Sequence, residues 1–180
     1  MAGRAEGPAP ATSSWGAAGI AVLDAFDRAA GVTIIVAMVV MVSVVSAQVF
    51  LRYALNSSLG WADEVSRLTF VWSIFLAIPL GVRAGAHIGI EIFVTRLPPP
   101  VRAALARIIA LAGCGVMLIV GYESIVIVID QWDEKMASLE ISAALFIVAV
   151  AIGAVHAALH LAWIALTGHP APGGIKVSAE

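Results

Sequence analysis

The residues from Ala29 to Leu51 form a run of 23 without a single charged side chain. A helix of this length spans about 34 Å at ~1.5 Å per residue, which is enough to cross the roughly 30 Å hydrocarbon core of a bilayer. Only 12% of the whole chain is charged and 61% is hydrophobic, whereas about 25% of a soluble domain is charged. The sequence therefore predicts an all-α integral membrane protein.

Three more apolar runs of sufficient length follow the first, so four transmembrane helices are expected. We predict them at residues 29–51, 61–82, 101–130 and 140–167. Short amphipathic helices at the membrane surface are predicted over 17–28 and over 90–97. The ends, 1–16 and 168–180, are expected to be disordered tails, so that 17–167 forms one membrane domain.

Lys and Arg are distributed unevenly between the two sides of the predicted membrane domain. Seven lie at the termini and in the loop between the second and third helices, and three lie on the opposite side. Because cytoplasmic segments carry an excess of Lys and Arg, both termini are expected in the cytoplasm. The charged residues around Arg52 and Arg67 are then expected at the periplasmic boundary of the membrane.

The stretch from Arg52 to Glu91 carries most of the charged and aromatic residues with a candidate role. Asp63 and Glu64 lie in the first turn of the predicted second helix, and Arg67 can pair with either carboxylate along one side. Two interpretations stay open: a solvated cluster at the membrane boundary, or a polar clamp, with Arg52 added, that fixes two helices for a partner subunit. The candidate subunit-interface residues of this stretch are Arg52, Tyr53, Trp61, Glu64, Arg67, Trp72, His87 and Glu91.

Further candidate positions are polar residues within or next to apolar runs. Glu123 lies about 9 Å inside the end of the third helix, and without a second intramembrane carboxylate it is expected to make a hydrogen-bonded contact between helices. His156 and His160 share one face of the fourth helix. Because they lack further ligands, packing or hydrogen bonding is expected there, and no metal or haem. His87 and Glu91 have the same spacing and are expected to anchor the surface helix.

Small residues recur every four positions in the fourth helix, at Ala149, Gly153 and Ala157. In lipid, such a stripe favours association because it lets two helix backbones approach closely. We therefore predict that this face packs against a neighbouring helix.

Several classes of function are disfavoured by the sequence. A net charge of −2 offers no basic surface for nucleic acid. There is no phosphate-binding glycine loop, no nucleophile with an adjacent base and no dense carboxylate cluster, so an enzyme is not expected. The single cysteine, Cys114, has no partner for a disulfide within the chain.

An ordered set of residues resembles the small membrane subunit of tripartite ATP-independent periplasmic (TRAP) transporters, the DctQ-like family. The set consists of Arg52-Tyr53, Trp61, Glu64, Arg67, Phe70-Val71-Trp72 and Gly85-Ala86-His87-Ile88. The resemblance implies a multi-pass protein of the bacterial inner membrane without a cofactor of its own. Its implied partners are a large membrane subunit, which holds the substrate and sodium sites, and a soluble periplasmic binding protein.

The resemblance also implies a role. Transporters of this family take up mostly organic acids bearing a carboxylate, using a sodium gradient. The small subunit is expected to act as a scaffold that packs against the static part of the large subunit while the transport domain moves.

An alternative from a different class is a membrane anchor of a respiratory oxidoreductase that binds haem or quinone. It would use His87 together with His156 or His160. A Soret band in the absorption spectrum of the purified protein would favour this alternative.

Overall fold

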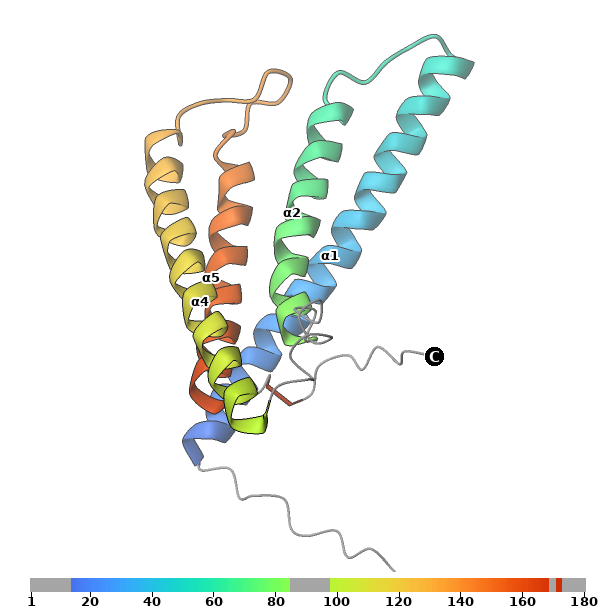
Figure 1. Cartoon of the computed structure of the whole chain (residues 1–180). Helices are drawn as coiled ribbons and strands as arrows, with labels where there is room; N and C mark the ends of the chain where they lie inside the picture. Colours follow the sequence, from blue (N-terminus) through green and yellow to red (C-terminus); the bar gives the residue numbers. More distant parts are fainter. Residues whose placement is uncertain (1–13, 85–97, 169–170, 173–180) are drawn as a thin grey trace, which may run out of the picture.

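The computed structural model describes residues 14–84, 98–168 and 171–172 of the chain. Most of this part is helical, and each of the four long helices is apolar enough to cross a membrane. The helices are α1 (Ser14–Ala54), α2 (Ala62–Arg83), α4 (Pro99–Asp130) and α5 (Leu145–Thr167) (Figure 1). The predicted all-α fold with four membrane spans is therefore confirmed.

The first helix is longer than predicted. α1 begins at Ser14 and continues without interruption through 17–28, so the separate surface helix predicted there is not found. The segment stays in line with the apolar run because its polar side chains find partners on other helices: Asp24 and Asp27 both pair with Arg83 of α2. The charged groups of 17–28 and the first membrane span therefore lie on one continuous helix.

The last helix starts later than predicted, at Leu145 and not at residue 140. The preceding residues pair across the α4–α5 loop instead, since the Met136 N–H donates to the Ile141 carbonyl at 3.0 Å and the Ala143 N–H donates to the Glu134 carbonyl at 2.8 Å. α2 and α4 begin and end within two residues of the predicted bounds.

The four helices pack in the spatial order α1, α2, α5, α4 (Figure 1). α1 and α4 are therefore the edge helices of a row, and each packs mainly on one neighbour. α1 begins and α5 ends at the same end of the molecule, where the α1–α2 and α4–α5 pairs converge (Figure 1). The two pairs diverge toward the other end.

The contact between α2 and α5 joins the two halves of the chain. Ala149 and Ala157 are fully buried on α5, and Gly153 lies between them. A Cβ atom added to Gly153 would lie only 2.4 Å from the carbonyl oxygen of Phe75 on α2, so the two backbones are in direct contact here. The predicted packing face of the fourth helix is thereby confirmed.

Some predictions fall outside the described residues. They include the surface helix over 90–97, the pair His87 and Glu91, and nearly all of both predicted tails. The cytoplasmic location of the termini stays a prediction.

Candidate functional site

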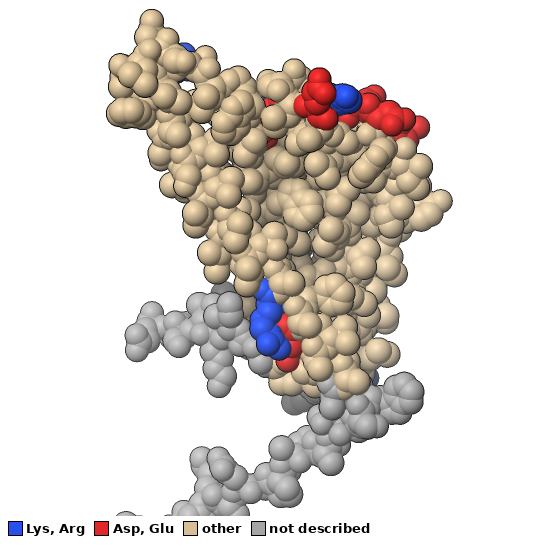
Figure 2. All heavy atoms as spheres, turned by 180° about the vertical axis from the view of Figure 1, so that it is seen from behind, with Lys and Arg blue, Asp and Glu red and all other residues tan. Residues whose placement is uncertain are grey.

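Charged side chains lie toward the two ends of the molecule. On the face shown in Figure 2, Lys, Arg, Asp and Glu gather toward either end, and a band without charge lies between them. Such a band matches the hydrocarbon core of a membrane, in which a charged side chain is costly. The candidate sites are therefore a polar group at each end and the apolar surface between them.

A buried ionic cluster lies at the end of the molecule where α2 stops. Arg83, the last residue of α2, has a side chain only 5% exposed. Its Nη2 donates to Oδ1 of Asp24 and to the main-chain carbonyl of Pro172, and its Nη1 donates to Oδ2 of Asp27. One guanidinium thus connects α1, α2 and the chain that follows α5. The Arg83 cluster comprises Asp24, Asp27, Arg83, His156 and His160.

The two histidines of α5 complete the Arg83 cluster. Nε2 of His156 lies 2.8 Å from Oδ1 of Asp27, and Nε2 of His160 lies 2.9 Å from the same oxygen. Both histidines are almost fully buried, and the ring of Phe26 packs against that of His156 with their centroids 5.7 Å apart. This is the hydrogen bonding between helices that the sequence predicts for the histidine pair.

The candidate residues predicted from the sequence do not include the two aspartates and the arginine of the Arg83 cluster. Asp24 and Asp27 belong to the segment predicted as a separate surface helix, where they would face water. A signal for them exists: the two aspartates lie three residues apart on one side of a helix, and Arg83 ends a membrane span on the same side of the membrane. Opposite charges brought to one membrane boundary need each other as partners.

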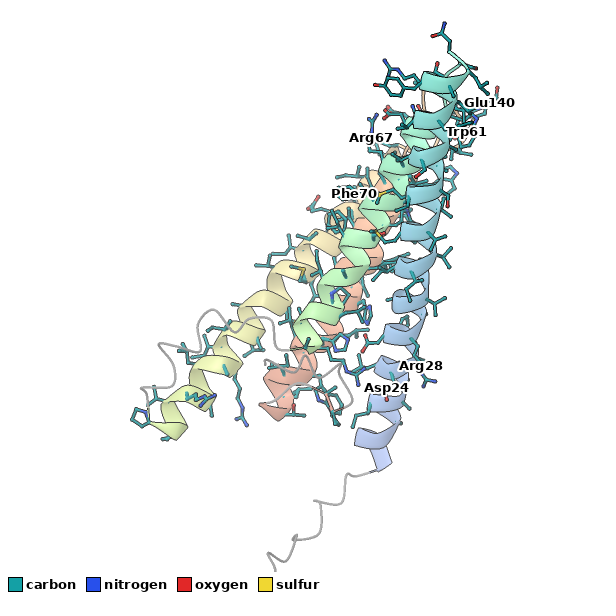
Figure 3. All side chains as sticks on the ribbon, turned by 90° about the vertical axis from the view of Figure 1, so that its right-hand side faces the viewer. Asp24, Arg28, Trp61, Arg67, Phe70 and Glu140 are labelled. Carbon is teal, nitrogen blue, oxygen red and sulfur yellow. The ribbon has the colours of Figure 1, made fainter. Side chains whose placement is uncertain are left out.

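The opposite end carries the charged stretch around the start of α2. Figure 3 shows Trp61, Arg67 and Glu140 at this end, far from Asp24 and Arg28. At this end the partners of Glu64 and Arg67 differ from the predicted ones, because the two side chains do not pair with each other.

Arg67 pairs with Asp63, four residues earlier, and both side chains are mostly exposed. Oε1 of Glu64 instead accepts a hydrogen bond of 2.9 Å from the Ser138 N–H, in the α4–α5 loop. Glu64 therefore connects α2 to the second half of the chain. Of the two open interpretations, the exposed Arg67–Asp63 pair fits a solvated cluster at the membrane boundary, and Glu64 and Arg67 do not pair with each other as a clamp between the first two helices.

The other predicted residues of this end divide into outward and inward ones. Tyr53 is 83% exposed, and Trp61 is also exposed. Arg52 lines an open hollow of about 430 Å³ beside the loop between α1 and α2. Trp72 is half-buried, and its Nε1 donates a hydrogen bond of 3.1 Å to the Leu145 carbonyl at the start of α5. Trp72 thus supports the α2–α5 contact, whereas Tyr53 and Arg52 face outward.

Glu123 faces away from the other described helices of this chain, so the predicted hydrogen-bonded contact between helices stays a prediction, and its partner helix would belong to another chain. Its side chain is exposed on α4, next to Tyr122, which is 67% exposed. On the same helix, a Cβ atom added at Gly115 would meet nothing within 4 Å. The outward surface of α4 therefore combines apolar side chains with an uncovered glycine and, within the apolar stretch, the carboxylate of Glu123.

Comparison with known proteins identifies the family. The family model described as "Tripartite ATP-independent periplasmic transporters, DctQ component" matches residues 41–168, which is well over half of the chain. This family is a component of transporters and not a family of enzymes, so the alternative of an oxidoreductase anchor gains no support. This alternative would use His87 together with His156 or His160, and both His156 and His160 have their Nε2 atoms directed at Asp27.

Curated relatives agree with this match. A Haemophilus influenzae protein named as a TRAP transporter small permease protein is 27% identical over 129 residues, covering 72% of this chain and 78% of the relative. The ectoine TRAP transporter small permease protein TeaB of Halomonas elongata is 34% identical over 88 residues, 49% of this chain and 46% of that protein. The sialic acid TRAP transporter small permease protein SiaQ of Vibrio cholerae is 26% identical over 89 residues, 48% of this chain and 51% of that protein.

The chain spans about half of the length of the last two relatives and more than three-quarters of the first. The family match covers part of α1 and the whole of α2, α4 and α5. With four helices in its described part that can span a membrane, the chain is a multi-pass protein of the bacterial inner membrane. It belongs to the DctQ family, the small membrane subunits of TRAP transporters.

Proposed function

We propose that this chain is the scaffold of a sodium-driven transporter. In this proposal it holds a large membrane subunit that takes up organic acids delivered by a periplasmic binding protein. The observation that carries the proposal is the uncovered surface of the two edge helices. Only 6% of the most apolar stretch of α1 and of α4 is buried within the chain, against 44% for α5.

The arrangement of the helices favours a scaffold over a translocation path. Helices in a row have no enclosed centre, and the buried polar residues of the Arg83 cluster are engaged in pairing helices at one end. A carrier needs a substrate site near the middle of the membrane, usually between structural repeats. In the described residues the middle of the row is instead a tight α2–α5 contact around Gly153.

The surface of α4 favours a protein neighbour over lipid alone. Glu123 is seven residues before the end of α4, about 10 Å along the helix, and its side chain is exposed. An intramembrane carboxylate requires a partner group. The glycine at 115 offers a place where another helix can come close. We therefore assign α4 as the helix that contacts the large subunit.

The substrate class rests on the relatives and on the family. Relatives are named for sialic acid, ectoine and C4-dicarboxylates. All of these compounds carry a carboxylate, so organic acids are the substrate class that we propose. Sodium is expected to bind in the large subunit.

Co-purification tests the scaffold. The chain is co-expressed with a large TRAP subunit of the same organism, and the complex is recovered through a tag on the large subunit. Gly115→Leu fills the uncovered place on α4 and should lower recovery of the complex at least several-fold. Glu123→Leu should do the same, because it removes the carboxylate that the large subunit would pair with.

The matched control is Gly31→Leu on α1, where an added Cβ atom also meets nothing within 4 Å. It should leave recovery of the complex unchanged. Each of the three variants, purified without the large subunit, should have the same unfolding temperature as the unmodified chain. Full recovery of the complex with both α4 variants would contradict the assignment of α4. In vesicles with a sodium gradient and the binding protein, uptake should require this chain together with the large subunit, and uptake by this chain alone would refute the scaffold role.

A further inference from the structure

The imidazoles and the inner carboxylate of the Arg83 cluster converge on one point. Nε2 of His156 and Nε2 of His160 lie 2.8 and 2.9 Å from Oδ1 of Asp27, and 3.2 Å from each other. The three side chains are 4%, 1% and 10% exposed, respectively. Three potential ligand atoms are thus held together in a nearly water-free place.

Hydrogen bonds alone do not satisfy the three converging atoms, Nε2 of His156, Nε2 of His160 and Oδ1 of Asp27. A neutral imidazole has one N–H group and one bare nitrogen, so bonds from both histidines to Asp27 require the proton of each ring on Nε2. The 3.2 Å contact between the two Nε2 atoms then joins two donors. If either Nε2 is bare, its lone pair faces the carboxylate oxygen. A single cation placed among the three atoms removes both conflicts.

The dimensions suit a divalent transition metal. Zn²⁺ binds histidine nitrogen at about 2.0–2.1 Å and carboxylate oxygen at about 2.0–2.2 Å, so neighbouring ligands of a tetrahedral ion are about 3.3 Å apart. The three observed separations, 2.8, 2.9 and 3.2 Å, are within about 0.5 Å of that value. An ion at these bond lengths would lie about 1 Å outside the plane of the three atoms, with a further position for water.

The remaining members of the Arg83 cluster support such a site. Arg83 donates to Oδ2 of Asp27 and thereby turns Oδ1 toward the histidines, as hydrogen bonds around metal ligands commonly do. The charge of the guanidinium opposes a cation, but Asp24 pairs with the same guanidinium. The formal charges of Asp24, Asp27 and Arg83 therefore sum to −1 before a metal binds.

We propose that Asp27, His156 and His160 bind one divalent transition-metal ion, with Zn²⁺ the preferred metal because it favours nitrogen and oxygen ligands in this geometry. The prediction of no metal depends on the lack of a third ligand near the histidine pair, and Asp27 of α1 supplies that ligand. The ion joins α1 to α5, which otherwise touch over a short stretch. Metal binding thus stabilises the end of the molecule where the two helix pairs meet.

The test uses the full chain, purified in detergent without a polyhistidine tag and stripped of metal with EDTA. Titration with Zn²⁺ should give one bound ion per chain, and the temperature of unfolding should rise with the Zn²⁺ concentration. Co²⁺ should compete for the same site and should give the visible absorption of a four-coordinate ion with nitrogen and oxygen ligands. Failure of the folded chain to bind stoichiometric Zn²⁺ would overturn the proposal.

Variants separate a metal site from a purely structural cluster. Asp27→Asn keeps the shape of the side chain but should weaken Zn²⁺ binding more than about 100-fold, since changes even to groups around metal ligands cost 10–100-fold. Asp27→Cys breaks the pair with Arg83 but keeps a zinc ligand, so it should retain Zn²⁺ and add a sulfur-to-Co²⁺ band. A merely structural role for Asp27 predicts no such band.

The histidines have a matched control in the same chain. The double variant His156→Gln/His160→Gln should lose stoichiometric binding, whereas His87→Gln/His169→Gln, which removes the other two histidines of the chain, should keep it. Helicity and elution as a single species establish that each variant is folded. Equal Zn²⁺ binding by the two double variants would refute the assignment.

Discussion

Replacement of Gly153 by alanine tests whether the two halves of the chain are held together by backbone contact. The new Cβ atom would lie 2.4 Å from the Phe75 carbonyl oxygen and 2.9 Å from its carbon. Carbon and oxygen atoms normally stay about 3.3 Å apart, so α2 and α5 must separate by roughly 0.9 Å at this point. Overpacking of this kind costs about 1–3 kcal/mol.

The intrinsic helix preference of alanine over glycine works in the opposite direction, by about 1 kcal/mol. Gly115→Ala isolates that gain, because an added Cβ atom meets nothing there. We expect Gly115→Ala to be neutral or up to about 1 kcal/mol more stable than the unmodified chain. Gly153→Ala should be about 2 kcal/mol less stable than Gly115→Ala, since only the alanine at position 153 clashes with α2.

The measurement is the unfolding of the purified chain, held in micelles of a mild detergent, by added SDS. Unfolding is followed by tryptophan fluorescence, to which Trp72 beside the α2–α5 contact contributes. Both glycine variants and the unmodified chain are compared under the same conditions. A Gly153→Ala chain as stable as Gly115→Ala would refute the close contact between α2 and α5.

Three further predictions concern single contacts. Arg83→Gln leaves two aspartates without their cation and should cost about 3 kcal/mol in the same unfolding assay, whereas Arg67→Gln, at an exposed pair, should cost less than about 1 kcal/mol. Equal losses would contradict the difference in burial. Trp72→Phe removes one hydrogen bond to the start of α5 and should cost about 1 kcal/mol, and an unchanged midpoint would exclude that bond. Glu64→Ala should speed hydrogen exchange at the Ser138 amide about tenfold, because it removes an acceptor worth roughly 1.4 kcal/mol; unchanged exchange would show that the amide has no such bond.

The membrane spans were predictable because their signals are local. An uncharged run fixes where a helix can cross lipid, and the prolines at 98–100 mark the start of α4. The small-residue face around Gly153 follows from spacing within one helix. The start of α5 was not predictable in this way, because residues 140–144 make hydrogen bonds across the loop that precedes them.

The Arg83 cluster depends on contacts that no local pattern encodes. Arg83 and Asp27 are 56 residues apart, and His160 and Asp27 are 133 apart. The sequence indicates that each group needs a partner but does not say which one. At the start of α2 the ambiguity is local: helix spacing allows Arg67 two possible carboxylates, and the geometry decides for Asp63.

The order of the helices in space has a consequence for biogenesis. α5 follows α2 and α4 in the chain and so leaves the ribosome after them, yet it packs between them. Until α5 enters the bilayer, the nascent chain has no large contact among its described helices that joins α4 to the α1–α2 hairpin. Assembly of these four helices in the membrane must therefore wait for the insertion of α5, and a chain truncated before Leu145 should expose α2 and α4 to membrane quality control.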